Sequence, residues 1–82
     1  MSAEDAIAAM VRDLGRALVD APDDVSVAVR EDRDRVLFEL SVPEEQRGQV
    51  IGRGGRVAHA LRTVTQAAGR AQGVRAGLDI VD

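Results

Sequence analysis

Val50-Ile51-Gly52-Arg53-Gly54-Gly55-Arg56-Val57 is the stretch that decides the expected fold. It places three glycines in four positions, with apolar residues before them and arginines within and after them. Glycine lacks a Cβ atom and adopts positive φ angles readily, so this stretch predicts a tight turn whose backbone a ligand can approach closely. Apolar residues at helical spacing follow, so the turn should lead into a helix N-terminus, where backbone N–H groups favour an anion.

The charge around this stretch is positive, although the chain as a whole is acidic. Residues 46–78 hold six arginines and no acid, residues 1–45 hold five arginines and twelve acids, and residues 79–82 add two acids. The formal net charge of −3 would by itself argue against a nucleic-acid binder. The asymmetry predicts one face that attracts an anionic partner and one that repels it, unless the charges are distributed without functional consequence.

Length and composition set the class of protein. Eighty-two residues suffice for one modest core, so we expect a single domain over residues 1–82. There is no cysteine, which excludes disulfides and thiolate metal sites, and the one histidine and the scattered acids have no ligand spacing, so we expect no metal and no cofactor. The longest apolar run, residues 6–11, is far shorter than the roughly 20 residues of a membrane span, so we expect a soluble cytoplasmic protein.

Periodicity predicts the elements of the first half of the chain. Ser2 and Asp5 resemble a helix capping box, and apolar residues then recur at intervals of four, three and four until about residue 20. This helical face consists of Ile7, Val11, Leu14 and Leu18. Alternating apolar residues over 25–29 and 36–42 predict two strands, joined by a polar turn over 31–34 into a hairpin.

The second half is predicted to hold two helices and a strand. Pro43, followed by two acids, marks the start of a short helix that Gly52 ends, and a longer helix is expected from about residue 55 to residue 71. Its apolar side should be Val57, Leu61, Val64 and Ala68, and its polar side His59, Arg62, Gln66 and Arg70. A last strand over 74–80 completes an α-β-β-α-α-β order. We therefore expect an α+β fold of two layers, a three-stranded sheet with the helices packed on one face.

The glycine-rich turn between two helices in this order resembles a KH domain of the bacterial, type II topology. The residues Pro43-Glu44-Glu45, Gly48 to Arg56, Ala58 to Thr63 and Ala67-Ala68 are similar to those of the KhpA family of small single-KH RNA-binding proteins. The resemblance covers essentially the whole chain. The chain departs from the family pattern at Gly54, where a basic or polar residue is common, so Arg53 is the only cation within the turn.

The resemblance implies a site for single-stranded RNA. KH domains clamp about four nucleotides with a Gly-x-x-Gly loop and read the bases in an apolar groove. Here Gly52, Arg53, Gly54 and Gly55 would hold the backbone, and Val50, Ile51 and Val57 would form the groove floor, with Ile51 the best placed. The alternative for these apolar residues is core packing, which is the favoured one for Val57. Arg53 and Arg56 are the expected phosphate contacts, and Arg47 and Arg62 are their neighbours. Arg70 and Arg75 fit solvated surface charges as well as phosphate contacts, and His59 is expected to be mainly solvated.

Other chemistries find little support. No serine lies near His59 in the expected order and there is no cysteine, so we expect no enzyme. A Walker loop would need a lysine and a hydroxyl that are missing here. Phe38 is the only aromatic residue, which disfavours folds that stack bases on exposed rings.

Two functional hypotheses stay open at this stage. The chain is either an RNA-binding module that acts as an RNA chaperone or an interaction subunit whose RNA binding is weak. The resemblance implies both self-association into a homodimer and cooperation with a KhpB (Jag or EloR) family protein in regulating transcripts, cell elongation and cell-wall homeostasis. A ribosome-associated assembly role is a further alternative, because similar KH domains occur in ribosomal and ribosome-assembly proteins.

Overall fold

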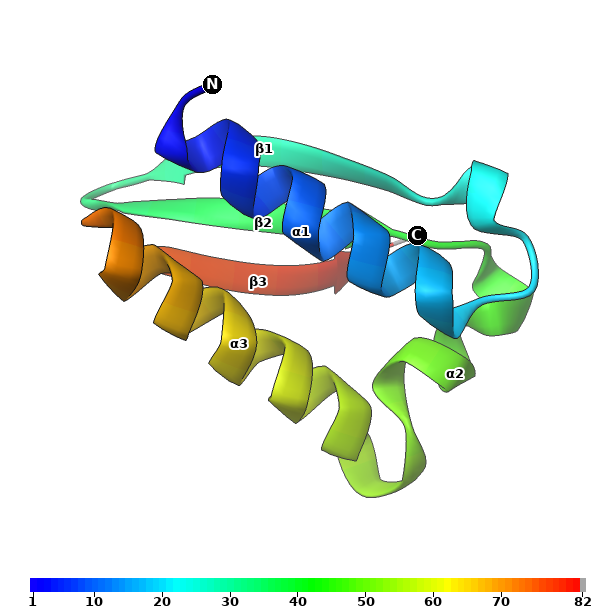
Figure 1. Ribbon diagram of the computed structural model, residues 1–82. Coiled ribbons are helices and arrows are strands. Elements are labelled where there is room, and N and C mark those ends of the chain that lie inside the picture. Colours follow the sequence, from blue (N-terminus) through cyan, green and yellow to red (C-terminus); the bar gives the residue numbers. More distant parts are fainter. Residues whose placement is uncertain (82) are drawn as a thin grey trace.

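The computed structural model describes residues 1–81 and has the predicted α-β-β-α-α-β order (Figure 1). The elements are α1 (Ala3–Leu18), β1 (Ser26–Asp32), β2 (Arg35–Ser41), α2 (Arg47–Ile51), α3 (Arg56–Gln72) and β3 (Ala76–Val81), with 3₁₀ turns η1 (Pro22–Asp24), η2 (Glu44–Gln46) and η3 (Arg53–Gly55). The α1 and α3 helices cover one face of the sheet (Figure 1). The predicted α+β fold of two layers is confirmed; Asp82, the last residue of the expected domain, lies outside the described residues.

The central strand of the sheet is β2, with β1 antiparallel on one side and β3 parallel on the other. Phe38 of β2 lies opposite Val29 of β1 and Leu78 of β3. Its ring has no exposed surface and packs with Ile7 and Val11 of α1 in a single apolar cluster. The only phenyl ring of the chain is therefore a core residue and is not available for base stacking.

The α1 helix begins at the predicted capping box. The Ser2 Oγ atom accepts a hydrogen bond from the Asp5 N–H (3.0 Å), and the Asp5 carboxylate accepts one from the Ser2 N–H (3.4 Å). At its other end the Gln46 Oε1 atom accepts hydrogen bonds from the Asp20 and Ala21 N–H groups, at 2.8 and 3.0 Å. These two bonds fix the chain after α1 against the residues just before α2, and so help to position the connection between α2 and α3.

The hairpin turn is shorter than predicted. The strands continue through Asp32 and resume at Arg35, which pair with each other, so Arg33 and Asp34 alone form the loop. Arg33 has a φ angle of 61° and is the only residue other than glycine with a positive φ within residues 1–81. Two-residue hairpin loops require positive φ because their twist must match that of the strands. Without a glycine or asparagine, the sequence had no marker for such a turn.

The buried face of α3 differs from the predicted one. Its buried residues are Ala58, Leu61, Thr65 and Gly69. Small residues let the helix approach the sheet closely, and the Thr65 hydroxyl is satisfied inside because it donates to the Leu61 carbonyl oxygen at 2.7 Å. Val64, predicted to be on the core side, is 44% exposed. The predicted face is rotated toward α1 relative to the buried face. The prediction considered only apolar residues, whereas small residues and a hydrogen-bonded threonine are also buried.

Within residues 1–81, no helix combines the length and the apolar composition that crossing a bilayer requires. Nor does this part of the chain bring three or more His, Asp or Glu side chains into a group that could hold a metal ion.

Candidate nucleic-acid interface

Three of the four residues of the 52–55 loop have positive φ angles. Gly52 has φ 76° and ψ 169°, a region that is essentially restricted to glycine, and Gly54 (φ 64°, ψ 18°) and Gly55 (φ 76°, ψ 15°) are left-handed. The Gly52 N–H donates to the Gly48 carbonyl oxygen (2.9 Å), and the Gly55 N–H donates to the Gly52 carbonyl oxygen (3.1 Å). The density of glycines is therefore explained by the backbone path, which reverses the chain between α2 and α3 within one short turn.

The two sides of this loop differ in the space around them. A Cβ atom on Gly54 or Gly55 would meet no other atom within 4 Å, whereas one on Gly52 would lie 2.5 Å from Val57 Cγ2. Gly52 therefore packs against the first turn of α3, and the backbone of residues 54 and 55 faces open space. A ribose-phosphate chain can approach this open side without meeting a side chain.

The loop leads into the N-terminus of α3. Its N-cap residue is Gly55, which has no side chain to accept from the first-turn N–H groups, and the first turn contains no acid. The Arg56 N–H donates to the Arg53 carbonyl oxygen, and the N–H groups that follow it, together with the helix dipole, make the start of a long helix favourable for an anion. The geometry is therefore that of a phosphate cradle, with the open backbone of the loop on one side and the helix N-terminus on the other.

The arginines nearest the loop are exposed and uncompensated. Arg53 lies within the loop and Arg56 is the first residue of α3. Both side chains are exposed, and neither forms an ion pair with another residue of the described chain, 1–81. A guanidinium group stays charged and matches the geometry of a phosphate, so these two arginines can meet an anion held by the loop.

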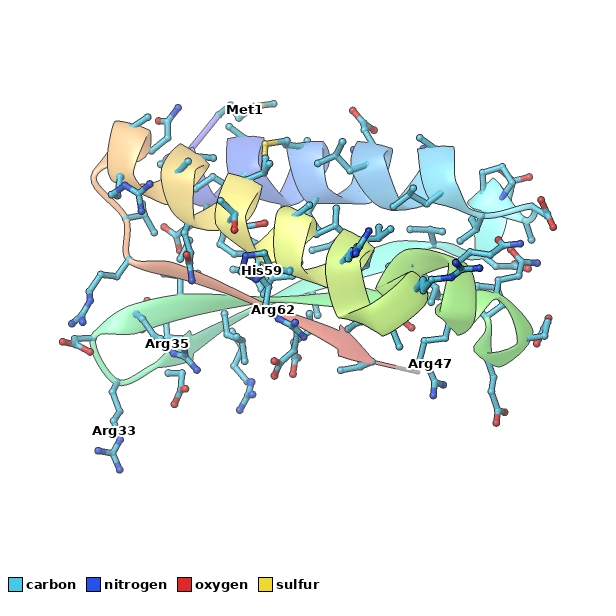
Figure 2. All side chains as sticks on the ribbon, turned by 90° about the horizontal axis from the view of Figure 1, so that it is seen from below. Met1, Arg33, Arg35, Arg47, His59 and Arg62 are labelled. Atoms are coloured by element: carbon cyan, nitrogen blue, oxygen red, sulfur yellow. The ribbon has the colours of Figure 1, made fainter. Side chains whose placement is uncertain are left out.

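The other two predicted cations lie in different settings. The Arg62 Nε atom donates to the Leu78 carbonyl oxygen (3.3 Å), which places this exposed side chain between α3 and β3, next to His59 (Figure 2). Arg47 is half-buried, its Nε and one Nη atom have no accessible surface, and it points away from α1 (Figure 2). Arg62 therefore borders the surface between α3 and β3, while Arg47 is less able to reach a phosphate than Arg53 or Arg56.

The predicted apolar groove floor requires one correction. Val50 has no exposed surface and belongs to the core cluster with Leu40 and Val42, so its assignment to the floor was wrong. The cause is the short α2 helix, which directs Val50 inward and the next residue outward. Ile51 is 38% exposed immediately before the loop, and Val57 is half-buried against Gly52. Ile51 is thus the apolar side chain that a base beside the loop would meet.

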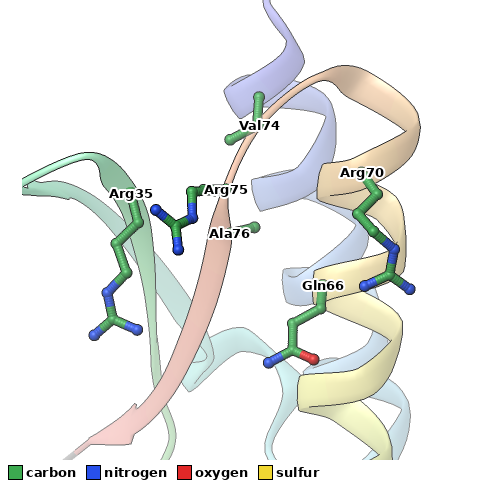
Figure 3. A pocket seen from close by; sticks show the side chains of 6 residues that line it. All are labelled: Arg35, Gln66, Arg70, Val74, Arg75 and Ala76. Atoms are coloured by element: carbon green, nitrogen blue, oxygen red, sulfur yellow. The ribbon is translucent and has the colours of Figure 1, made fainter.

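Sequence reasoning missed a second group of arginines at the other end of α3. The sequence leaves Arg70 and Arg75 open between solvated charges and phosphate contacts and does not group them, but with Arg35 they line one hollow (Figure 3). Arg35 is far from Arg70 and Arg75 in the sequence and meets them because β3 pairs in parallel with β2 and α3 returns over the sheet. Their approach depends on this parallel pairing, for which the sequence carries no local signal.

Comparison with known proteins agrees with this geometry. The family model described as the KH domain of KhpA and KhpB matches residues 8–80. The chain belongs to the KhpA/KhpB KH-domain family. The RNA-binding protein KhpA of Halalkalibacterium halodurans is 47% identical to it over 73 residues, which are 89% of this chain and 96% of that protein. RNA-binding protein KhpA of Streptomyces coelicolor is 49% identical over 69 residues, 84% of each chain, and that of Treponema pallidum is 41% identical over 69 residues.

Membership of the KhpA/KhpB family confirms the resemblance predicted from the loop and the element order. The family is defined by a KH domain and its relatives are named for RNA binding, so it is not a family of enzymes. The match begins within α1 and ends within β3, so it includes the 52–55 loop and every element that packs around it.

Proposed function

We propose that this chain binds single-stranded RNA by clamping the backbone between the 52–55 loop and the N-terminus of α3. The observation that carries the proposal is the combination of three positive-φ glycines, an α3 N-terminus without a side-chain cap, and two exposed arginines, Arg53 and Arg56, at one place. The names of the relatives support RNA as the anionic partner. Gly52, Gly54 and Gly55 hold the backbone, and the two arginines neutralise phosphates.

The bases are proposed to lie against Ile51 and the gap between α3 and β3 that Arg62 borders. Ile51 offers an apolar surface. The Arg62 Nε–H donates to the Leu78 carbonyl oxygen, and the other N–H groups of this guanidinium remain as hydrogen-bond donors for a base. Since Phe38 is buried, its ring does not contribute base stacking. A site with few directed base contacts discriminates weakly between sequences, which suits a protein that acts as an RNA chaperone on many transcripts.

The salt dependence of RNA affinity tests the clamp. Each phosphate neutralised on a single strand contributes about −0.7 to the slope of log K against log salt concentration. Arg53→Gln and Arg56→Gln are each expected to make the slope shallower by about 0.7 and to weaken binding to an oligouridine. Fluorescence anisotropy between low and moderate salt measures both quantities.

Arg12→Gln is the matched control, because Arg12 is an exposed arginine on α1 and its loss changes the net charge by the same amount. It should leave the slope close to that of the parent. An equal change of the salt slope in Arg12→Gln and Arg53→Gln would mean that only overall charge affects binding. The proposal that the loop binds the RNA backbone would then be rejected.

We also propose that the chain forms a homodimer through an apolar groove between α1 and α3. The groove has a volume of about 240 Å³ and is lined only by apolar residues: Leu14, Ala17, Leu18, Val57, Ala60, Leu61 and Val64. Apolar surface that is open to water favours association. This groove also supports the alternative that the chain is chiefly an interaction subunit, so the two functions need separate tests.

Substitution at the rim of the groove tests the dimer. Val64→Glu is expected to give a monomer in sedimentation equilibrium while the parent is a dimer, because the carboxylate would be desolvated at the interface. Thr63→Glu is the control, since Thr63 is exposed on α3 and does not line the groove. A monomeric parent, or a Val64→Glu variant that stays dimeric, would reject this interface. Retained RNA binding in a monomeric variant would show that the two functions are separable.

The physiological role is proposed from the family. We propose that the chain acts in the cytoplasm as one domain over residues 1–82, and that it works with a KhpB (Jag or EloR) family protein on transcripts that affect cell elongation and the cell wall. Linking two weak clamps raises their combined affinity without new contacts, which gives such pairing a physical purpose.

A further inference from the structure

A hollow of about 370 Å³ lies at the end of α3 opposite the 52–55 loop (Figure 3). Its lining residues are Arg35, Gln66, Arg70, Val74, Arg75 and Ala76. They come from the start of β2, the last turns of α3 and the segment that leads into β3 (Figure 3). Three arginine residues therefore line one hollow, and none of its six lining residues is an acid; we call it the arginine pocket.

The three arginines of the pocket retain hydrogen-bonding capacity. Arg75 pairs with Asp34 (2.6 Å) and Arg35 with Asp32 (3.3 Å), but all four side chains are at least 40% exposed, so these ion pairs are weak and can exchange for another anion. Each guanidinium has five N–H donors, more than these pairs use. Arg70 has no ion pair or hydrogen bond of its side chain with any residue in 1–81, so it is the cation most available to a ligand.

A polar stripe on α3 connects the loop to the arginine pocket. Its members are Arg56, His59, Arg62, Gln66 and Arg70, at intervals of three, three, four and four residues. These intervals place them on one face of the helix, and all five are exposed. The bond from Arg62 to the Leu78 carbonyl oxygen turns this face toward β3. No acid occurs in α3, so the helix itself places no negative charge along the stripe.

The length of the stripe sets the minimum length of a single strand that could contact both the loop and the arginine pocket. Arg56 and Arg70 are 14 residues apart, about 21 Å at the helical rise of 1.5 Å per residue. At the stacked spacing of about 3.4 Å per nucleotide, this corresponds to about six nucleotides of a single strand. A strand clamped by the loop through about four nucleotides reaches the pocket when it is about ten nucleotides long, and a four- or five-nucleotide strand does not.

We propose that the arginine pocket is a second phosphate site, which holds the backbone of a single-stranded RNA that extends from the loop along α3. The inference rests on the proposed RNA-binding function and extends its site from about four to about ten nucleotides. The ligand chemistry is a phosphodiester, recognised by Arg70 and Arg75 and supported by Arg35 and Gln66. The loop provides the affinity for short RNA, and the pocket adds affinity only for longer RNA.

Two oligonucleotide lengths test this second site. The affinities of oligouridines of five and twelve nucleotides are measured by anisotropy for the parent and for the Arg70→Gln/Arg75→Gln double variant. We expect the double variant to bind the 12-mer about tenfold more weakly, with a salt slope shallower by about 1.4, and to bind the 5-mer as the parent does. Each oligonucleotide is compared between proteins, because a longer strand offers more binding registers to every protein.

The controls separate the second site from the loop. Arg12→Gln/Arg16→Gln removes two exposed arginines of α1 and should leave both affinities nearly unchanged. The Arg53→Asp/Gly54→Asp variant should bind both oligonucleotides more weakly than the parent. If its affinities equal those of the parent, the proposed loop function fails. The second site is rejected if the Arg70→Gln/Arg75→Gln variant binds the 12-mer with the affinity of the parent, or if its affinities for the 5-mer and the 12-mer fall by the same factor. Either result leaves the loop function standing.

Discussion

Replacing Arg53 and Gly54 together by aspartate is expected to lower the affinity for single-stranded RNA at least about 100-fold, corresponding to about 2.8 kcal/mol. The change removes the only cation of the 52–55 loop and adds two carboxylates where a phosphate would lie. The fold should tolerate it. Gly54 has left-handed angles that aspartate adopts more readily than most residues, and its Cβ would meet no atom within 4 Å. Carboxylates near the start of α3 also interact favourably with the helix dipole.

The neutral double variant, Arg53→Asn/Gly54→Asn, is the matched control for this charge reversal. Its side chains have nearly the same shape as the two aspartates, without the negative charge. We expect it to lose about tenfold in affinity, and circular dichroism of both variants should match the parent. RNA affinity equal to that of the parent in the aspartate variant would place the phosphate site somewhere other than the loop.

Gly52→Ala is expected to lower the free energy of unfolding by about 3 kcal/mol, a large part of the 5–15 kcal/mol typical of a domain. Its φ of 76° and ψ of 169° are strained for any residue with a Cβ atom, at about 1–3 kcal/mol. The new Cβ would also lie 2.5 Å from Val57 Cγ2 and 3.0 Å from the Val57 backbone nitrogen. A side-chain rotation can relieve the first contact but not the second. Urea denaturation measures the loss.

Gly48→Ala provides the control for this backbone effect. Gly48 lies within α2, does not have a positive φ angle, and has open space where its Cβ would be. Alanine there should be neutral or stabilise the fold by up to about 1 kcal/mol, because it favours the helix. A Gly52→Ala variant within about 0.5 kcal/mol of the parent would mean that the loop has another accessible path, and the clamp geometry would not be required.

The fold could be predicted largely because local signals agreed with one another. The Ser2 and Asp5 capping box, the change from helical to alternating periodicity after residue 24, and the glycines at 52–55 each correspond to an observed boundary. The loop itself was predictable because three glycines in four positions correspond to three positive φ angles. These features depend on residues close together in the sequence.

The features that the sequence did not reveal depend on tertiary packing. Val50 and Ile51 are both apolar neighbours of the loop, and only the orientation of α2 decides that Val50 is buried and Ile51 exposed. The burial of Thr65 depends on its bond to the Leu61 carbonyl oxygen, and the exposure of Val64 on where α1 lies. The meeting of Arg35 with Arg70 and Arg75 depends on the parallel register of β2 and β3, which no local pattern encodes.

Chemical-shift mapping tests the central claim of a loop clamp most directly. ¹⁵N-labelled protein is titrated with an oligouridine about five nucleotides long, the length that the loop alone is expected to hold. The largest amide shifts are expected at residues 51–58, with smaller ones near Arg62 and Leu78, and almost none in β1 (Ser26–Asp32). Largest shifts in α1 or β1, with residues 52–55 unmoved, would contradict the account.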